Sequence, residues 1–298
     1  MSFTESGFVV IDKPQGVTSH DVVAKVRKTL GTRKVGHAGT LDPMATGVLV
    51  IGVNQATRFL DYIVSGSKEY EATVRLGMNT ISDDKDGEVI STFDTSQLTE
   101  DQIAKSFAKN VGKISQLPSK VSAKKVQGKR AHALVRDGVE FELQPRDVEI
   151  SEIEIYSITK IDKFVDVDVR VKCSAGTYIR AIARDVGADL GVGGHLISLR
   201  RTLVAPFDLA VAQTLDEPLI LIDIYSTVSK ALATLEVNSD IAERITFGKP
   251  LDKKLDISNQ PTALTFKNQV LAIVHRNSSN EIEYRAVFAN GLDLELQD

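Results

Sequence analysis

Apolar and polar side chains alternate strictly over residues 164–173, where valines occupy every second position up to Cys173. A period of two places the apolar set on one face of an extended strand and the charged set on the other. This pattern is typical of an antiparallel strand with one exposed face. Short apolar runs bounded by turn residues predict further strands at residues 7–11, 48–53, 69–76 and 197–202.

Apolar residues at a helical spacing predict several helices. The first has its apolar residues on one face, with Ser19 as the expected N-cap and Gly31 as the stop signal. The next marked start is at Thr99, where Gln102 completes a capping box. Two more helices are expected at residues 55–64 and 177–190.

The composition changes after about residue 205. Residues 207–238 are expected to hold one or two helices, and residues 239–298 contain the short apolar runs PTALTF, VLAIVH and YRAVFA. The order of elements predicts a mixed α+β domain at residues 1–235, followed by a small β-rich domain at residues 236–298.

The overall composition is that of an ordinary soluble protein, with 42% hydrophobic and 26% charged residues among 298. No apolar run is long enough to span a bilayer, and the first residues lack a signal-peptide pattern. Cys173 is the only cysteine, which excludes an internal disulfide and a cysteine metal cluster. The histidines show no ligand spacing. These features predict a cytoplasmic protein with neither a metal site nor a membrane segment.

The net charge of −4 argues mildly against a nucleic-acid partner, but the charge is unevenly distributed. Residues 206–298 carry 8 Lys and Arg against 14 Asp and Glu, whereas residues 1–205 carry 28 against 26. The basic residues gather in three clusters: Lys25, Arg27, Lys28, Arg33 and Lys34; Lys120, Lys124, Lys125, Lys129 and Arg130; and Arg180, Arg184, Arg200 and Arg201. Any one cluster could be a solvated face. Three of them within residues 1–205 favour an RNA partner.

The segment 36–47 carries the strongest candidate chemistry. Three glycines and a proline predict an irregular loop with one carboxylate, Asp42, at its centre. A buried loop carboxylate that has N–H groups nearby can be positioned and kept ionised. The alternative is a turn in which Asp42 only accepts hydrogen bonds from its own backbone.

The sequence GHAGTLDPMATGVL in this segment closely resembles the catalytic motif of the TruB family of tRNA pseudouridine synthases. Further similar segments follow the family's order: DKPQGVTSHDVV, KEYEATVRLG, QLPSKVSAKKVQGKR, CSAGTYIRAIARDVG and GGHLISLRRT. The resemblance implies an α+β catalytic domain with a central mixed or antiparallel sheet, and a C-terminal PUA-like β domain. It also implies isomerisation of uridine to pseudouridine at position 55, in the T-loop of tRNA.

The resemblance assigns roles to five residues. Asp42 matches the essential aspartate, Tyr70 the tyrosine that stacks on the flipped base and removes a proton, and Arg180 the arginine that pairs with the aspartate. Leu199 matches an apolar residue that packs on the uracil, and His37 a histidine that stacks in the opened T-loop. Without the resemblance, the default reading of Tyr70 is a half-buried strand residue and that of Arg180 a solvated helix face.

Other expectations concern the RNA. Contacts are expected from Lys13, Lys124, Lys129, Arg130, Arg184 and Arg200. Residues 79–88 are acidic and turn-rich but lack the closing Glu of a calcium loop, so a mobile loop is expected there. With the basic stretch 118–138 it would form an RNA-binding insertion within residues 79–138. Val121 stands where many family members have tyrosine. The reaction needs no cofactor, the partner is the T stem-loop of tRNA, and a monomer without an obligatory protein partner is expected.

Three alternatives remain at this point. A guide-RNA-dependent enzyme of the same superfamily shares the aspartate motif. A non-catalytic RNA-binding protein or tRNA-folding chaperone would use the basic clusters alone. A carboxylate-dependent hydrolase would need a second acid beside Asp42, and its loop contains none.

Overall fold

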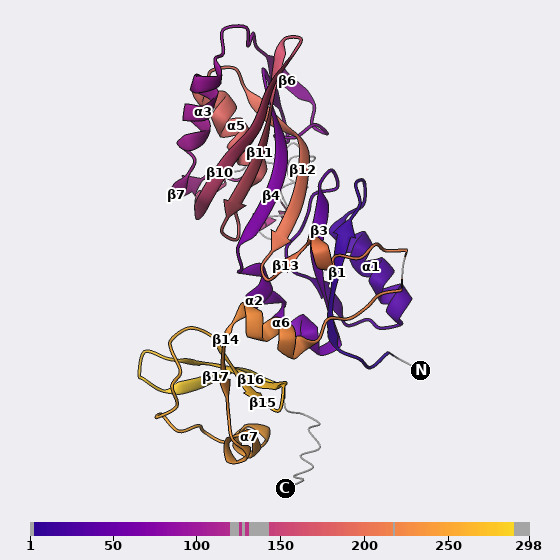
Figure 1. Cartoon of the computed structure of the whole chain (residues 1–298), viewed down its shortest axis with the longest axis vertical. Coiled ribbons are helices and arrows are strands. Elements are labelled where there is room, and N and C mark those ends of the chain that lie inside the picture. Colours follow the sequence, from indigo (N-terminus) through magenta and orange to yellow (C-terminus); the bar gives the residue numbers. More distant parts are fainter. Residues whose placement is uncertain (1–2, 120–124, 127–128, 131–142, 217, 289–298) are drawn as a thin grey trace.

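A computed structural model of the chain describes residues 3–119, 125–126, 129–130, 143–216 and 218–288. Its central feature is a nine-stranded sheet (Figure 1). Seven strands follow one another in the order β1-β3-β12-β4-β11-β10-β7, while β2 pairs with β3 and β13 pairs with β12. The strands are β1 (Gly7–Lys13), β2 (Val35–His37), β3 (Thr46–Val53), β4 (Lys68–Leu76), β7 (Gly112–Gln116), β10 (Arg146–Ile161), β11 (Phe164–Cys173), β12 (Gly194–Val204) and β13 (Phe207–Asp208). The predicted α+β class with a mixed sheet is confirmed.

One parallel pairing joins two antiparallel parts of this sheet. β12 runs parallel to β3 through Arg200 and Arg201, which lie opposite Thr46 and Gly47, and the other neighbouring strands pair antiparallel. Gly47 has a φ of 100°, and a Cβ there would collide with the backbone carbonyl of Arg201. The glycine therefore allows β12 to approach the end of the 36–47 segment closely.

The alternating segment forms β11 as predicted. Its apolar face, the odd-numbered residues from Val165 to Cys173, is buried. Both neighbouring strands, β4 and β10, are antiparallel to it. Asp166 lies on the other face but is also largely buried, because Arg75 on β4 donates two hydrogen bonds to its carboxylate. Paired charges of this kind can lie on a covered face without a large free-energy penalty.

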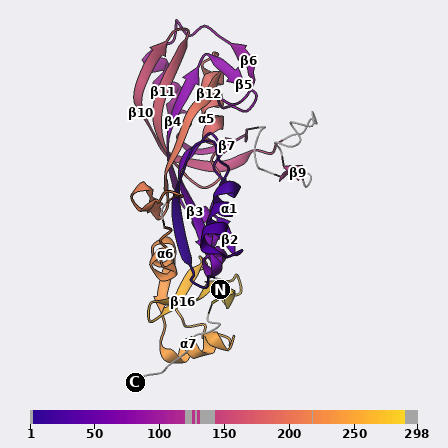
Figure 2. The same cartoon turned by 90° about the vertical axis from the view of Figure 1, so that its right-hand side faces the viewer.

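Helices cover both faces of the sheet. They are α1 (Ser19–Leu30), α2 (Leu60–Val64), α3 (Glu100–Ala108), α5 (Ile179–Asp189) and α6 (Ile224–Ala231), with 3₁₀ segments η1 (Asn54–Phe59) and η2 (Leu209–Val211). A further helix, α7 (Ser239–Thr246), belongs to a separate core cluster in the C-terminal part. Apolar side chains of α1, α3 and α5 belong to one core cluster, and those of α2 and α6 to a second on the opposite face. Figure 2 shows α1 and α6 on opposite sides of the strands.

The helix caps were predicted in part. The capping box of Thr99 and Gln102 is present at α3. At α1 the predicted cap was wrong by one position, because Thr18 caps the helix and forms its box with Asp21. Ser19 is the first helical residue, and its buried hydroxyl contacts the backbone of the 36–47 segment instead.

Residues 79–88, where a mobile loop was expected, are partly buried. They connect β5 (Met78–Thr80) to β6 (Val89–Thr92), and Asp83 and Asp84 are buried, with exposed fractions of 9% and 6%. Part of the wider stretch 79–138 belongs to the central sheet, where β7 is an edge strand. The RNA-binding insertion expected within this stretch stays a prediction. The short strands β8 (Lys125–Val126) and β9 (Lys129–Arg130) pair with each other in a separate two-stranded sheet.

A second sheet forms the C-terminal part, with β14 (Ala233–Glu236), β15 (Thr262–Phe266), β16 (Gln269–Arg276) and β17 (Ile282–Val287) in sequence order. The three predicted short runs form β15, β16 and β17. β14 pairs with β15 although it lies before the predicted boundary at residue 236. Figure 1 shows this unit at the opposite end of the molecule from α3 and β6, with α6 beside it.

Within the described residues, no helix is long and apolar enough to cross a membrane.

Candidate active site

The loop that carries Asp42 lies between β2 and β3 and is held on both sides of the carboxylate. The hydroxyl of Ser19 accepts from the N–H of Leu41 at 2.9 Å and donates to its carbonyl at 3.1 Å. After Asp42, the carbonyl of Pro43 accepts from the N–H of Gly16 at 2.8 Å. A loop anchored before and after its central residue presents that side chain in one position.

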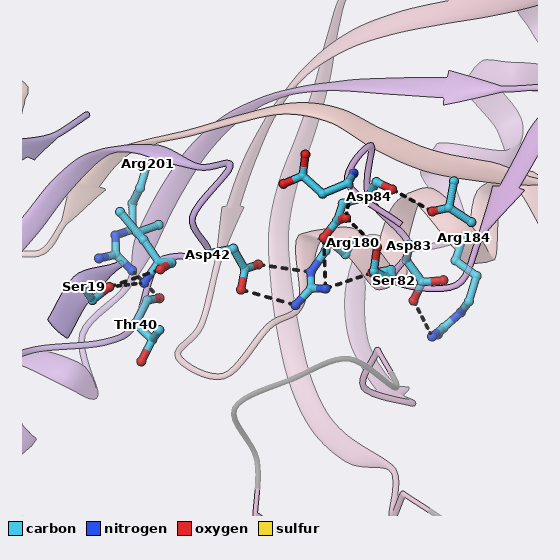
Figure 3. A network of polar contacts seen from close by, with 12 residues as sticks. Ser19, Thr40, Asp42, Ser82, Asp83, Asp84, Arg180, Arg184 and Arg201 are labelled. Carbon is cyan, nitrogen blue, oxygen red and sulfur yellow. Dashed lines mark hydrogen bonds and ion pairs between the residues drawn. The ribbon is translucent and has the colours of Figure 1, made fainter. Parts of the chain in front are cut away.

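Asp42 forms an ion pair with Arg180, the second residue of α5 (Figure 3). The guanidinium Nε lies 3.1 Å from one carboxylate oxygen and Nη2 lies 3.4 Å from the other. A guanidinium in this position favours the ionised form of the carboxylate. Although 36% of the Asp42 side chain is open to the cavity beside it, its surroundings are poorly hydrated. Burial therefore raises the pKa of Asp42, and Arg180 opposes that rise.

The other edge of Arg180 contacts the segment between β5 and β6. Its Nη1 donates to the carbonyl of Ser82 at 2.8 Å and lies 3.1 Å from a carboxylate oxygen of Asp84. The Ser82 hydroxyl donates to the other oxygen of Asp84 at 2.5 Å. Arg180 is therefore clamped between two carboxylates, and 5% of it is exposed. Nothing in the sequence of 79–88 indicated this role, since a buried and a solvated acidic turn have the same composition.

A cavity of about 270 Å³ opens beside the ion pair. Its lining includes Asp42, Tyr70, Arg180, Leu199 and Arg201. Four of these five were singled out from the sequence, and the structure brings them together. The volume lies near the lower end of ligand pockets, which start at about 300 Å³.

Tyr70 lies on β4, and its ring is almost fully buried in the wall of the cavity. Burial raises the pKa of the phenol, and the positive charge of Arg201 opposes this rise. Leu199 supplies an apolar surface from the neighbouring strand β12. The site thus combines one carboxylate, one guanidinium, one phenol and an apolar wall.

Arg201 was noted only as a member of a basic cluster, but it is a buried part of the site. Its Nε donates to the carbonyl of Val48 at 2.8 Å, and Nη2 donates to that of Gly39 at 3.1 Å. Nη1 lies 3.5 Å from the carbonyl of Thr40. The RR pair in the sequence does not reveal which arginine points inward.

Lys13 does not have the RNA-contacting position that was expected. The residue is fully buried, and its amino group donates to the carbonyls of Pro14, Val17 and Pro43. Burial lowers the pKa of this amine to about 8. Lys13 thus ties the end of β1 to the Asp42 loop, and its amino group is buried away from the protein surface.

Two other expected RNA contacts lie nearer the surface. Arg200 donates both Nη groups to the carboxylate of Asp12, at 3.0 and 2.7 Å. Arg184 lies between Asp83 and Asp185, at 3.4 and 2.8 Å. Neither lines the cavity around Asp42, and their contact with RNA stays a prediction.

His37 lies on β2, outside the cavity lining, with its ring edge against His20 at 5.6 Å between centroids. Burial, with His20 adding to it, lowers the pKa of His37 and favours the neutral ring. Lys124 falls outside the described residues. Lys129 and Arg130 form β9, and their side chains are likewise outside the description.

Within the described residues, no three His, Cys, Asp or Glu side chains are grouped so as to hold a metal ion. The expectation that the reaction needs no cofactor stays a prediction.

Comparison with known proteins identifies the family. A sequence profile described as the N-terminal domain of the TruB family of pseudouridylate synthases matches residues 27–179. A second profile, the C-terminal domain of tRNA pseudouridylate synthase B, matches residues 180–231. The chain belongs to the TruB family of pseudouridylate synthases. Its membership makes it an enzyme of that family, as the resemblance of the Asp42 motif implied.

Relatives of this TruB-family chain cover most of its length. It is 53% identical to the tRNA pseudouridine synthase B of Rhodococcus jostii (strain RHA1) over 252 residues, which are 83% of each chain. It is 44% identical to the protein of the same name from Corynebacterium jeikeium (strain K411), over 97% of each chain. Among solved structures, a Cbf5-Nop10-Gar1 complex matches 96% of this chain and 85% of that chain, with a TM-score of 0.72 and 25% identity.

Proposed function

We propose that this chain isomerises uridine to pseudouridine at position 55, in the T-loop of tRNA, with Asp42 as the nucleophile on a flipped-out nucleotide. The observation that carries this is the Asp42–Arg180 ion pair beside a cavity walled by Tyr70 and Leu199. The name shared by its relatives, tRNA pseudouridine synthase B, supports tRNA as the substrate.

The cavity geometry suits one nucleotide removed from its stack. Flipping a nucleotide out of a folded loop costs a few kcal/mol of lost stacking. Contact with an aromatic ring such as Tyr70 recovers about 1–3 kcal/mol. In the proposal Leu199 packs on the uracil from β12, and the open side of Asp42 faces the sugar. The carboxylate then attacks, or helps to expel, the base from the nucleotide.

In the proposal Arg180 orients the carboxylate of Asp42, the nucleophile. Two hydrogen bonds to Asp42 hold the carboxylate plane, and the contacts with Ser82 and Asp84 hold the guanidinium itself. Such support matters because a displacement of about 1 Å can reduce a rate about 100-fold. In the proposal Tyr70 removes the proton from carbon 5 after the ring has rotated and rejoined the sugar.

RNA binding outside the cavity is proposed to come from the half-exposed arginines Arg184 and Arg200 and from the basic segment near β8 and β9. Structured RNA is recognised largely through its backbone and its unstacked loop bases. Because phosphate contacts dominate such binding, affinity should fall steeply as the salt concentration rises.

The test is to incubate the purified chain with an unmodified tRNA transcript and to map pseudouridine at single-nucleotide resolution. We expect one new pseudouridine at position 55 with the unaltered chain and none with Asp42→Asn. A modification at another position would contradict the proposed target. Modification that persists in Asp42→Asn would contradict the proposed nucleophile.

The alternatives have different outcomes in the same assay. A guide-RNA-dependent enzyme would leave the transcript unmodified until guide RNA and partner proteins were added. A chaperone would bind the transcript and speed its folding without modifying it. The contacts around Asp42 do not favour the hydrolase alternative, which needs two carboxylates in the cavity. The second acid, Asp84, lies across Arg180 and outside the cavity lining.

A further inference from the structure

Two buried cations in the cavity wall are not used by the mechanism proposed above. Lys68, at the start of β4, is 6% exposed, and Arg201, on β12, is 1% exposed. Both line the cavity with Asp42 and Tyr70. Burying a charge in protein is costly unless it has a compensating partner, so two such charges in one wall need a physical explanation.

Neither cation has a carboxylate partner among the described residues. The amino group of Lys68 donates to the carbonyls of Val64 and Gly66, at 2.7 and 2.9 Å. Arg201 donates to the carbonyls of Val48 and Gly39, at 2.8 and 3.1 Å. Carbonyl dipoles satisfy hydrogen bonds but leave the charge uncancelled. The wall therefore keeps an excess of positive charge in a poorly hydrated place.

The fold directs both cations toward the same space. Arg201 lies directly opposite Tyr70 in the antiparallel β4–β12 pair, and Lys68 is two residues before Tyr70 on the same strand face. Gly39 closes this space from the Asp42 loop. A Cβ on Gly39 would lie 3.6 Å from Nη1 of Arg201 and 3.9 Å from Cε of Lys68. The two side chains thus pack against one point of the loop, next to the reacting residues.

We propose that Lys68 and Arg201 stabilise the negative charge that develops on the uracil ring while it is detached from the sugar. This inference rests on the proposed function. The ligand class is an anionic nucleobase, and the stabilisation is electrostatic, of the kind that oriented donors provide for an oxyanion.

The charge arises from the chemistry of the proposed reaction. When the C1′–N1 bond breaks, its electron pair stays on the uracil and is delocalised over N1, O2 and O4, while the Asp42 carboxylate bonds to C1′. The uracil anion then returns that electron pair through C5 to C1′, and the carboxylate leaves. A base removes the C5 proton, and a proton is restored to N1. Atoms and charge balance without a co-reactant, and the anion exists only between the two bond changes.

The positions of the positive side chains in the cavity lining agree with a role of Lys68 and Arg201 in stabilising the uracil anion. Arg180 already pairs with Asp42, so its charge is committed to the carboxylate. Lys68 and Arg201 are the cations in the described cavity lining that remain uncommitted to a carboxylate. Lys13 is also buried against carbonyls, but it does not line the cavity. Lys13 is therefore assigned to the structure of the loop and not to the anion.

The experiment measures single-turnover rates with saturating enzyme and, separately, the Kd for tRNA. The variants are Lys68→Met and Arg201→Met, with Lys68→Arg and Arg201→Lys as charge-retaining counterparts. Arg75→Met is the control for lost stability, because Arg75 lies on β4 and pairs with the buried Asp166, outside the cavity lining. We expect each Met variant to lower the rate about 10²–10³-fold, with Kd and the Arg75→Met rate nearly unchanged.

A pH profile separates charge from packing. The amine of Lys68 faces Arg201 and Tyr70 within the sheet and Cys173 on β11. Burial lowers its pKa to about 8, whereas burial raises the pKa of the Cys173 thiol to about 11, so that thiol stays neutral. The Lys68 charge is present below about pH 8 and lost above it. The rate should therefore fall above pH 8 in the unaltered chain, and this fall should disappear in Lys68→Met and Lys68→Arg.

Each contrary outcome is recognisable. Weaker tRNA binding with an unchanged saturated rate would show that the cations bind a phosphodiester, and would overturn the inference. A lower rate that keeps the same fall above pH 8 in Lys68→Met would assign the titration to another group, such as Lys13, and leave Lys68 a packing role. Absence of pseudouridine with the unaltered chain would refute the proposed function itself, and this inference with it.

Discussion

Two pairs of arginines, one lining the Asp42 cavity and one outside it, differ in burial. Each inner arginine nevertheless has an outer arginine close to it in the sequence. The inner pair, Arg180 and Arg201, is 5% and 1% exposed. The outer pair, Arg184 and Arg200, has side chains that are 25% and 36% exposed. Arg180 and Arg184 share helix α5, and Arg200 and Arg201 are adjacent on β12.

A buried guanidinium and a guanidinium near solvent can have different functions, because their surroundings differ. An inner guanidinium has fixed partners in a poorly hydrated site, where its field is strong and its geometry is set. An outer guanidinium forms ion pairs near solvent, and such pairs contribute about 0–1 kcal/mol each. It can therefore exchange a carboxylate for an RNA phosphate at little cost. We expect inner changes to alter the chemical rate and outer changes to alter binding.

The largest effect should come from Asp42, which pairs with Arg180 and lines the same cavity as Arg201. Asp42→Asn removes the negative charge and the nucleophile while conserving shape, so the single-turnover rate should fall on the order of 10⁴-fold or more. The Kd for tRNA should stay within about twofold, because no phosphate contact is lost. Rate and Kd are measured on the same tRNA transcript. A variant that keeps even a tenth of the rate would remove Asp42 from the chemistry.

Tyr70→Phe should follow, with a rate loss of about 10²–10⁴-fold, the range for removing a general base. The ring remains in the wall, so stacking and the Kd for tRNA should be preserved. The informative measurement compares release of the C5 proton with cleavage of the C1′–N1 bond. Full activity in this variant would leave Tyr70 with stacking alone.

Arg180→Lys tests the inner pair directly. Lysine keeps the charge but cannot hold both oxygens of Asp42 together with Ser82 and Asp84. We expect a rate loss of about 10²–10³-fold and little change in Kd. The matched outer variant is Arg184→Lys, one turn along the same helix, which should keep nearly the full rate. Equal rates in the two variants would erase the distinction between the inner and outer positions.

Asp84→Asn should have a smaller effect on the rate, because Asp84 acts through Arg180 and does not line the cavity. Loss of this partner lets the guanidinium shift, and a displacement of about 1 Å reduces a rate about 100-fold at most. We expect a loss of about 10–100-fold. A double variant with Arg180→Lys should be no slower than Arg180→Lys alone, whereas additive losses would mean that Asp84 acts independently.

The smallest effect should come from the outer pair. Arg184→Gln and Arg200→Gln should each weaken tRNA binding a few-fold and lower the slope of log K against log salt by about 1. The saturated rate should not change. Lys253→Gln, which removes an exposed ion pair with Glu281 in the C-terminal part of the chain, serves as the control. A salt slope that is unchanged in both arginine variants would exclude phosphate contacts from the outer pair.

Local patterns in the sequence predicted the elements well. The alternation that ends at Cys173 became β11, and the capping box at Thr99 became the start of α3. The Asp42 loop and the family were identified from one continuous motif. These features depend on residues within a few positions of one another, and backbone geometry converts such short spacing into structure.

Local patterns failed where burial depended on distant segments. Ser19 was predicted as a cap and instead bonds Leu41, 22 residues away. Asp84 was assigned to a mobile loop, but Arg180, 96 residues away, makes its burial favourable. Lys13 was expected to contact RNA and instead satisfies three carbonyls inside the protein. The sequence around a charged residue does not show whether a distant partner will make its burial favourable.

By itself, the sequence determined the α+β class, most of the strands and helices, the TruB family and the position of the central carboxylate. The tertiary structure decided which charged side chains line the cavity beside Asp42. Arg201 reaches the carbonyl of Val48, 153 residues away, only because β12 pairs in parallel with β3 beside a glycine that permits close approach. The free energy of a buried charge depends on all the groups that surround it. Those groups come together only when the sheet is complete.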